Sequence, residues 1–152
     1  MHPMLTTAVK AARRAGNVIN RGARDLDLLT VSSKGPKDFV SEIDTQAERE
    51  IIDTVHRRYP QHDFLGEESG QSGHDSEFLW IIDPLDGTTN FLHGYPQFAV
   101  SIGVQRRGRM EHAVVYDPMR QELFTASRGE GAQLDGKKIR VTPHIGLERA
   151  LI

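Results

Sequence analysis

The chain has 152 residues, which is enough for one domain with its own hydrophobic core. Hydrophobic residues make up 38% of it and charged residues 26%, so the composition excludes a disordered protein. A formal net charge of −2 gives no overall attraction to nucleic acid, and the absence of cysteine excludes disulfides and thiolate metal sites. No run approaches ~18 apolar residues and the start lacks a signal-peptide core, so we expect a soluble, cytoplasmic protein with no membrane segment.

Two amphipathic helices open the sequence. Apolar residues recur at helical spacing over residues 4–20, and this helix is expected to end near Gly22. A loop is predicted over residues 30–38 because serine, glycine and proline cluster there. A second helix is predicted over residues 41–58, with Ser41 as its N-cap.

The remainder of the sequence is rich in predicted strands. Apolar runs separated by turn residues predict strands over residues 63–66, 78–82, 98–104, 110–116 and 122–126, followed by a hairpin across Asp135-Gly136. The glycine- and acid-rich residues 66–75 are expected to be an exposed loop. Two helices followed by mainly antiparallel strands predict an α+β layered domain.

The densest group of chemically active residues follows the longest apolar run. Asp83 and Asp86 flank Pro84, which fixes the backbone between them, and Gly87 leaves room for close approach of a ligand. Thr88-Thr89-Asn90 are helix N-cap types, and free N–H groups at a helix start favour phosphate. Hard oxygen ligands suit Mg²⁺ rather than zinc. Asp-Pro and Asp-Gly pairs also occur in plain turns, but the whole octet after a buried strand favours a metal and phosphate site.

Other polar segments are ambiguous by themselves. Gly66-Glu67-Glu68-Ser69 is either a pair of acids that holds a metal and orients a water, or a solvated loop. Glu42 and Asp44, at the expected helix start, need only offset the helix dipole. The seven histidines show no metal spacing and are expected to be structural or exposed. The turn Arg106-Arg107-Gly108-Arg109 is either a solvated hairpin tip or a contact for an anion or a partner.

Three ordered segments resemble the inositol monophosphatase family. The residues Asp83-Pro84-Leu85-Asp86-Gly87-Thr88-Thr89-Asn90 look like its metal-binding signature. Gly66-Glu67-Glu68-Ser69 resembles its preceding acidic motif, and Asp38-Phe39-Val40 with Asp44 resembles the segment upstream of both. Finer features are similar to the bacterial SuhB-like branch. The resemblance covers nearly the whole chain and implies a layered αβαβα fold, of which this chain supplies the first helices and the larger antiparallel sheet.

The resemblance also implies a role for each matching residue, with Mg²⁺ as the cofactor. The implied metal ligands are Glu67, Asp83, the Leu85 carbonyl and Asp86. The implied substrate-binding residues are Gly87, Thr88 and Asp86. The implied catalytic residues are Glu67, Thr88 and Asp44. Thr88, supported by Asp44, would position the attacking water, and Lys34 lies near the position of a loop lysine in the family.

The activity that the resemblance implies is Mg²⁺-dependent hydrolysis of a small phosphomonoester. The expected substrate is myo-inositol 1-phosphate, attacked directly by an activated water without a covalent phospho-enzyme. Nucleotide bisphosphatase and fructose bisphosphatase activities remain open. The alternative is a non-catalytic partner of the transcription antitermination machinery of ribosomal RNA synthesis, with the Arg106–Arg109 turn as a candidate contact. A homodimer is expected from the family habit and from an exposed sheet edge.

One departure from the family concerns its second half. That half carries a Trp-Asp motif, which completes the second metal site, whereas the only tryptophan here, Trp80, precedes Ile81. The sequence ends on the apolar residues Ala150-Leu151-Ile152. We therefore expect residues 1–152 to form a single N-terminal metal- and phosphate-binding domain with low activity alone. A truncated gene product, a fragment of a longer chain and a diverged protein all fit this expectation.

Overall fold

The computed structural model describes the whole chain except residues 27–34, 74, 144–145, 147 and 149–152. Its helices are α1 (Pro3–Leu26), α2 (Pro36–His56) and the short α3 (Thr88–Leu92). Its strands are β1 (Asp63–Gly66), β2 (Gly70–Ser72), β3 (Phe78–Asp86), β4 (Ala99–Arg106), β5 (Arg109–Asp117), β6 (Glu122–Ser127), β7 (Gly131–Leu134) and β8 (Lys137–Ile139). None of the helices in the described part of the chain is long and apolar enough to cross a membrane.

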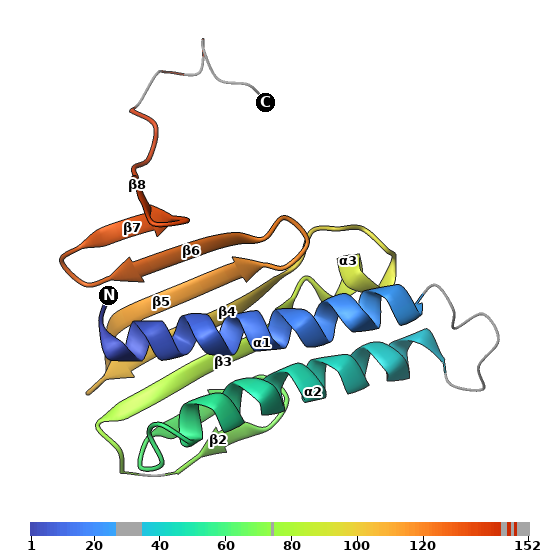
Figure 1. Cartoon of the computed structure of the whole chain (residues 1–152), viewed down its shortest axis with the longest axis horizontal. Coiled ribbons are helices and arrows are strands. Elements are labelled where there is room, and N and C mark those ends of the chain that lie inside the picture. The colour runs from blue at the N-terminus through green and yellow to red at the C-terminus, as the bar shows by residue number, and fades with distance from the viewer. Residues whose placement is uncertain (27–34, 74, 144–145, 147, 149–152) are drawn as a thin grey trace.

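The described strands form one sheet in the order β2-β1-β3-β4-β5-β6-β7-β8. Only β1 and β3 are parallel, and every other neighbouring pair is antiparallel. The helices α1 and α2 run antiparallel to each other across one face of this sheet (Figure 1). The α+β prediction with a mainly antiparallel sheet is therefore confirmed.

The core lies between the two helices and the sheet. Alternate residues of the central strands point into it, among them Trp80, Ile82, Val100, Ile102, Val104 and Val114. The buried face of α1 is built mainly from small residues, including Ala8, Ala11, Ala12 and Ala15. Small side chains let α1 approach α2 and the sheet closely, and Gly22 is a clear case, since a Cβ there would lie 2.7 Å from Ile43 Cδ1.

The ends of the helices differ from the prediction. The first helix continues past Gly22 to Leu26. The second begins at Pro36, so the N-cap prediction for Ser41 is wrong. Gly35 is the N-cap in an extended conformation, and Pro36 suits the first turn because no N–H is needed there. Residues 30–34 of the predicted loop lie outside the described residues, and residues 36–38 are helical.

The strands and turns follow the predicted pattern with one addition. The Asp135-Gly136 turn joins β7 and β8, and both residues have the positive φ, 49° and 80°, that a tight hairpin turn requires. Within the stretch 66–75, which was expected to be a loop, residues Gly70–Ser72 form β2 and pair with β1. All three residues of β2 are exposed, so no apolar pattern signalled this strand.

Candidate active site

The site begins where two parallel strands end. Leu65 of β1 pairs with Ile81 of β3, and the N–H of Glu67 donates to the carbonyl of Ile82 at 3.1 Å. Because the two strands are parallel and Gly66 pairs with Ile82, Glu67, which follows β1, lies beside Asp83 of β3. This is the only parallel pair in the described sheet, and it brings together two of the predicted motifs.

The turn after β3 has a fixed backbone. The register with β4 shifts between Asp83 and Asp86. Gly87 then adopts a φ of 96°, and a Cβ on it would lie 2.9 Å from the carbonyl oxygen of Gln97. Gly87 is therefore required here both for its φ and for the close backbone approach. It is also the N-cap of α3, so Thr88, which was predicted to be of cap type, lies within the helix.

Asp44 approaches this turn from α2. It lies in the middle of the helix with only 4% of its surface exposed, and its Oδ1 has no hydrogen-bond partner in the described part of the chain. Burial is the largest cause that raises its pKa, to about 7. The other causes are the negative charges of Glu68, Glu67, Asp83 and Glu48. The alternative that Asp44 offsets the dipole at the helix start is wrong, because Asp38 is the acid of the first turn.

Asp83 has a similar environment. Burial raises its pKa to about 6, together with a hydrogen bond that its protonated form donates to Glu67. The charges of Glu67 and Asp86 add repulsion, and a bond to the backbone of Leu85 partly offsets them. Its Oδ1 also lacks a partner within the described residues. Asp44 and Asp83 thus belong to one group of carboxylates that repel each other when all are charged.

Sequence reasoning missed Glu48, which shapes the acidic loop. Its carboxylate is 2% exposed and accepts the N–H groups of Glu68 and Ser69 at 2.9 and 3.0 Å. It fills the space beside Gly66, where a Cβ would lie 2.5 Å from Oε2. The signal was an acid four residues after Asp44 on the apolar stripe of α2, where a solvated acid does not belong.

A cavity of about 330 Å³ opens beside these groups. Its lining includes Asp44, Glu67 and Thr88, one residue from each predicted motif, and Lys37, which is basic. Asp83 and Asp86 are not among the lining residues. The structure therefore brings the three predicted catalytic residues to one cavity. Lys34, named with the upstream motif, lies outside the described residues.

The chemistry of the acidic group fits a divalent cation. Its donors are hard oxygens, two buried carboxylate oxygens lack partners, and mutual repulsion raises two pKa values. In the described part of the chain, however, no three Asp, Glu or His side chains stand close enough to hold a metal by themselves. The Leu85 carbonyl accepts the Thr88 hydroxyl at 3.1 Å. The ligand set therefore stays a prediction.

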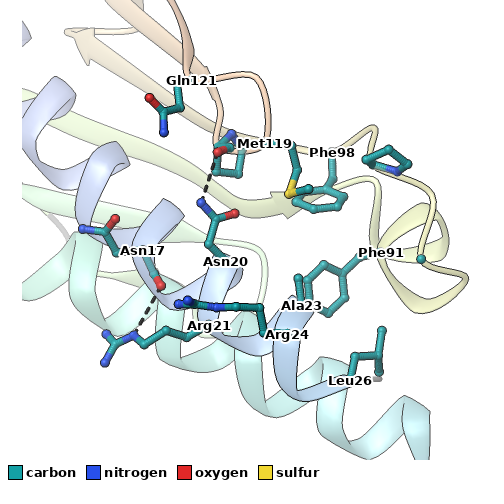
Figure 2. Close-up of a pocket in the computed structure, with 13 residues that line it drawn as sticks. Asn17, Asn20, Arg21, Ala23, Arg24, Leu26, Phe91, Phe98, Met119 and Gln121 are labelled. Carbon is teal, nitrogen blue, oxygen red and sulfur yellow. Dashed lines mark hydrogen bonds between the residues drawn. The ribbon is translucent and has the colours of Figure 1, made fainter. Parts of the chain in front are cut away.

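A larger cavity, of about 860 Å³, lies on the other side of α3. Phe91, Phe98 and Met119 form its apolar side, and Asn20 and Arg24 of α1 lie across from them (Figure 2). The amide of Asn20 donates to the Pro118 carbonyl at 3.1 Å. None of the predicted site residues lines this cavity, so it is separate from the acidic site.

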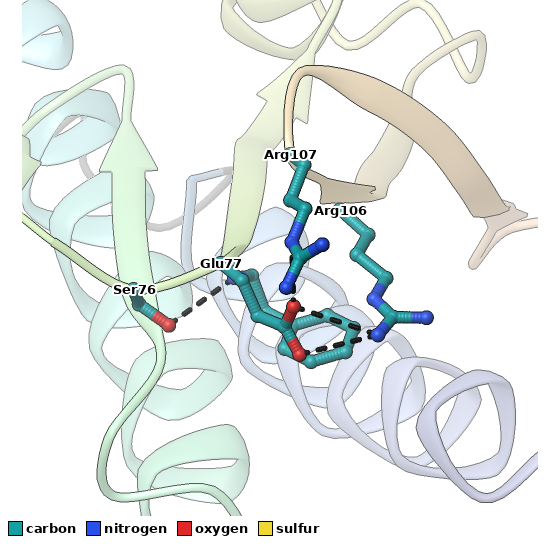
Figure 3. Close-up of polar contacts among 5 residues, drawn as sticks. Ser76, Glu77, Arg106 and Arg107 are labelled. Carbon is teal, nitrogen blue, oxygen red and sulfur yellow. Dashed lines mark hydrogen bonds and ion pairs between the residues drawn. The ribbon is translucent and has the colours of Figure 1, made fainter.

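The basic turn proposed as a partner contact is partly neutralised. Glu77 pairs with Arg107 Nε at 2.9 Å and with Arg106 Nη2 at 3.4 Å (Figure 3). The guanidinium of Arg106 also lies over the ring of Phe78, with its Cζ 5.5 Å from the ring centroid. These contacts fix the turn to β3, and they leave Arg109 as its one arginine without an ion pair in the described part of the chain.

Helices on one face of a mainly antiparallel sheet, with carboxylates at the end of its one parallel pair, define a phosphatase-type fold. The chain belongs to the inositol monophosphatase family, whose model matches residues 1–152. Among its relatives, the Nus factor SuhB of Pseudomonas aeruginosa is 52% identical over 155 residues, covering all of this chain and 57% of that protein. The Nus factor SuhB of Escherichia coli K12 is 57% identical over 141 residues, covering 92% and 53%.

Solved structures agree with this assignment. The extragenic suppressor protein SuhB of Bartonella henselae matches with a TM-score of 0.84 and 39% identity, over 94% of this chain and 56% of that one. An inositol monophosphatase from Anabaena matches with a TM-score of 0.79 and 38% identity, over 93% and 50%. The chain thus spans little more than half the length of the relatives it matches.

Proposed function

We propose that this chain forms the metal- and phosphate-binding part of a Mg²⁺-dependent phosphomonoesterase that acts on myo-inositol 1-phosphate. The observation that carries the proposal is the convergence of Asp44, Glu67 and Thr88 on one cavity, beside Asp83. Family membership supports the reaction class. The raised pKa values of Asp44 and Asp83 indicate an excess of negative charge at this point, which suits a cation.

Each residue has a proposed role. Glu67, Asp83, Asp86 and the Leu85 carbonyl would hold Mg²⁺, which when bound lowers the pKa of water and neutralises charge on the leaving group. Gly87, Thr88 and Asp86 would bind the substrate. The Thr88 hydroxyl would turn from Leu85 towards the attacking water, take a proton from it and pass its own proton to Asp44.

The test is phosphate release from myo-inositol 1-phosphate by the purified chain, in Mg²⁺ and in EDTA, together with Mg²⁺ binding by calorimetry. Asp83→Asn is the site variant, and Asp53→Asn, an aspartate of α2 that does not belong to the acidic group around Asp83, is its matched control. We expect release and Mg²⁺ binding by the wild type and by Asp53→Asn, and neither by Asp83→Asn.

Slow release is still consistent with the proposal, because the matched relatives are longer than this chain. Release that is equal in EDTA, or that persists in Asp83→Asn, would contradict it. A folded wild-type chain that neither binds Mg²⁺ nor releases phosphate would also contradict it.

A second candidate function is supported by the relatives named Nus factor SuhB. We propose as the alternative that the chain acts without catalysis as a partner of the transcription antitermination machinery. The contact proposed is the Arg106–Arg109 turn, where Arg109 is the arginine not paired with Glu77. We expect Arg109→Ala to bind a purified antitermination complex more weakly than wild type, and Arg24→Ala to bind it equally well. Equal affinity of wild type and both variants would remove the turn from consideration. For either function we propose a cytoplasmic location and a homodimer as the assembly.

A further inference from the structure

A groove of about 500 Å³ lies between the N-terminal half of α1 and the C-terminal end of α2. The antiparallel arrangement of the two helices brings these ends together (Figure 1). The polar residues that matter for its chemistry are Lys10, Arg14, Thr54, Arg57 and Arg58. No residue of the acidic site lines it.

The groove is strongly basic in a chain whose formal net charge is −2. Four cationic side chains line it, and none of the described lining residues is acidic. The one adjacent carboxylate with an ion pair is Glu50, 3.6 Å from Arg14, and both side chains of that pair are more than two-fifths exposed. Such an exposed pair is weak and leaves most of the positive charge uncompensated.

Two helix faces build this charge with regular spacing. Lys10 and Arg14 are four residues apart on α1. Thr54 lies in the last turn of α2, and Arg57 and Arg58 directly follow that helix. Arg57 and Arg58 follow a helix C-terminus, where cations are favourable without any ligand. That effect does not account for Lys10 and Arg14, because they lie far from the C-terminus of their own helix.

A buried hydroxyl supplies an independent observation. Thr54 is only 7% exposed, lines the groove, and its Oγ1 has no hydrogen-bond partner in the described part of the chain. A buried polar group without a partner is uncommon and calls for an explanation. The oxygen itself is closed to solvent, so a shift of the neighbouring groove side chains on binding would bring an acceptor to this hydroxyl.

We propose that this groove binds an oligoanion that carries several phosphate groups. Lysine and arginine are the side chains that bind phosphate, and hydroxyls donate to its oxygens. None of the described lining residues is aromatic, so the groove offers nothing on which a base could stack. The phosphates rather than any attached group are therefore recognised. They come either from a free oligophosphate or from an RNA backbone.

The experiment uses the purified chain in EDTA, so that the acidic site holds no metal. Fluorescence anisotropy measures the affinity for a fluorescein-labelled oligouridylate, and calorimetry measures the affinity for inorganic tripolyphosphate independently. The groove variant is Lys10→Ala/Arg57→Ala/Arg58→Ala. The matched control, Arg120→Ala/Lys137→Ala/Lys138→Ala, removes the same charge from exposed positions that do not line the groove.

We expect the groove variant to bind at least about tenfold more weakly and the control within about twofold of wild type. The slope of log affinity against log salt should fall by about 2 in the groove variant, for three lost contacts with a single strand.

Thr54→Val, which keeps the side-chain shape, should weaken binding without loss of stability. Binding of tripolyphosphate alone would identify a free oligophosphate as the ligand. Binding of RNA alone would identify an RNA backbone as the ligand. Equal losses in both triple variants, or no binding of either probe at 50 mM salt, would overturn the proposal.

Discussion

Burial acts on individual acids of this chain in two different ways. Asp44 and Asp83 each keep a buried oxygen without a partner, and their pKa values rise to about 7 and about 6. Glu48 is buried more completely than either, but its carboxylate accepts two backbone N–H groups. Asp44 and Asp83 are therefore suited to binding an ion, whereas Glu48 holds a loop. Only the hydrogen-bond partners distinguish the two cases.

Glu48→Gln tests the structural role. An amide has one acceptor oxygen, so one of the N–H groups of Glu68 and Ser69 loses its partner. We expect a loss of about 1–3 kcal/mol in the free energy of unfolding, measured in urea. Glu50→Gln, an exposed acid on the same helix, should change it by less than about 0.5 kcal/mol. Equal effects of the two substitutions would show that Glu48 does not hold the loop.

His62 tests the pH dependence of stability. Trp80 Nε1 donates to His62 Nδ1 at 3.0 Å, and burial lowers the pKa of His62 despite the opposing charges of Asp63 and Glu77. The unfolded chain takes up this proton near pH 6.5 and the folded chain only at lower pH, so the contribution of His62 to stability falls as pH falls below 6.5. The raised pKa values of Asp44 and Asp83 act in the opposite sense over this range, in wild type and variant alike. The unfolding free energy at pH 5 relative to pH 7.5 should therefore be higher in His62→Asn than in wild type.

The control for that measurement is His93→Asn, at the exposed C-terminal end of α3. The change in its unfolding free energy between the two pH values should equal that of the wild type. An equal change in His62→Asn and wild type would mean that His62 titrates alike in the folded and unfolded chains.

At the scale of elements, the site depends on the turn from β3 to α3. The backbone passes from the strand through Gly87, whose positive φ and closeness to Gln97 set the direction of α3. Asn90 Nδ2 holds the same turn by donating to the Gln97 carbonyl at 2.8 Å. Thr88 therefore reaches the cavity through this constraint on the backbone.

Gly87→Ala tests this constraint against Gly94→Ala. Both glycines have a positive φ, 96° and 68°, but a Cβ at Gly94 meets nothing within 4 Å. Both variants carry backbone strain of about 1–3 kcal/mol, and only Gly87→Ala also forces a backbone shift. We expect the unfolding free energy of Gly87→Ala to be at least about 1 kcal/mol lower than that of Gly94→Ala. Equal values would show that the approach to Gln97 can relax without cost.

The elements also show what the sequence could predict. The octet that begins at Asp83 and the strand before it were identified because their pattern is local. Glu48 was missed, since its partners belong to a loop twenty residues away in the chain. The strand β2 was missed because its side chains are all exposed, and pairing of its backbone carries no sequence pattern. The start of α2 was misplaced because Ser41 was preferred over Gly35-Pro36 as the first residue of the helix.

At the scale of the whole molecule, the two faces of the sheet differ. The helices α1 and α2 cover one face, and no helix of the described chain covers the other (Figure 1). Val115 on β5 and Phe124 on β6 are directly opposite each other on that second face, and Val115 is 39% exposed. An apolar sheet face of this kind favours contact with another surface.

We therefore expect the purified chain to self-associate through this face. Analytical ultracentrifugation should show an oligomer for wild type, and a shift towards monomer in Val115→Lys, because a buried lysine without a partner opposes the contact. Val141→Lys, at a position that is 92% exposed outside the sheet, should leave the oligomer intact. A monomeric wild type at all concentrations would contradict this expectation.

The central claim is that the carboxylates around Asp83 form a cation site, and thermal unfolding at pH 8 tests it most directly. In EDTA, Asp83→Asn should have a higher Tm than wild type, because it removes a charge that burial and Glu67 disfavour. With Mg²⁺ the Tm of wild type should rise, since binding to the folded state alone stabilises it, and the Tm of Asp83→Asn should not. If Mg²⁺ raises both Tm values equally, or neither, the carboxylates around Asp83 are not a cation site.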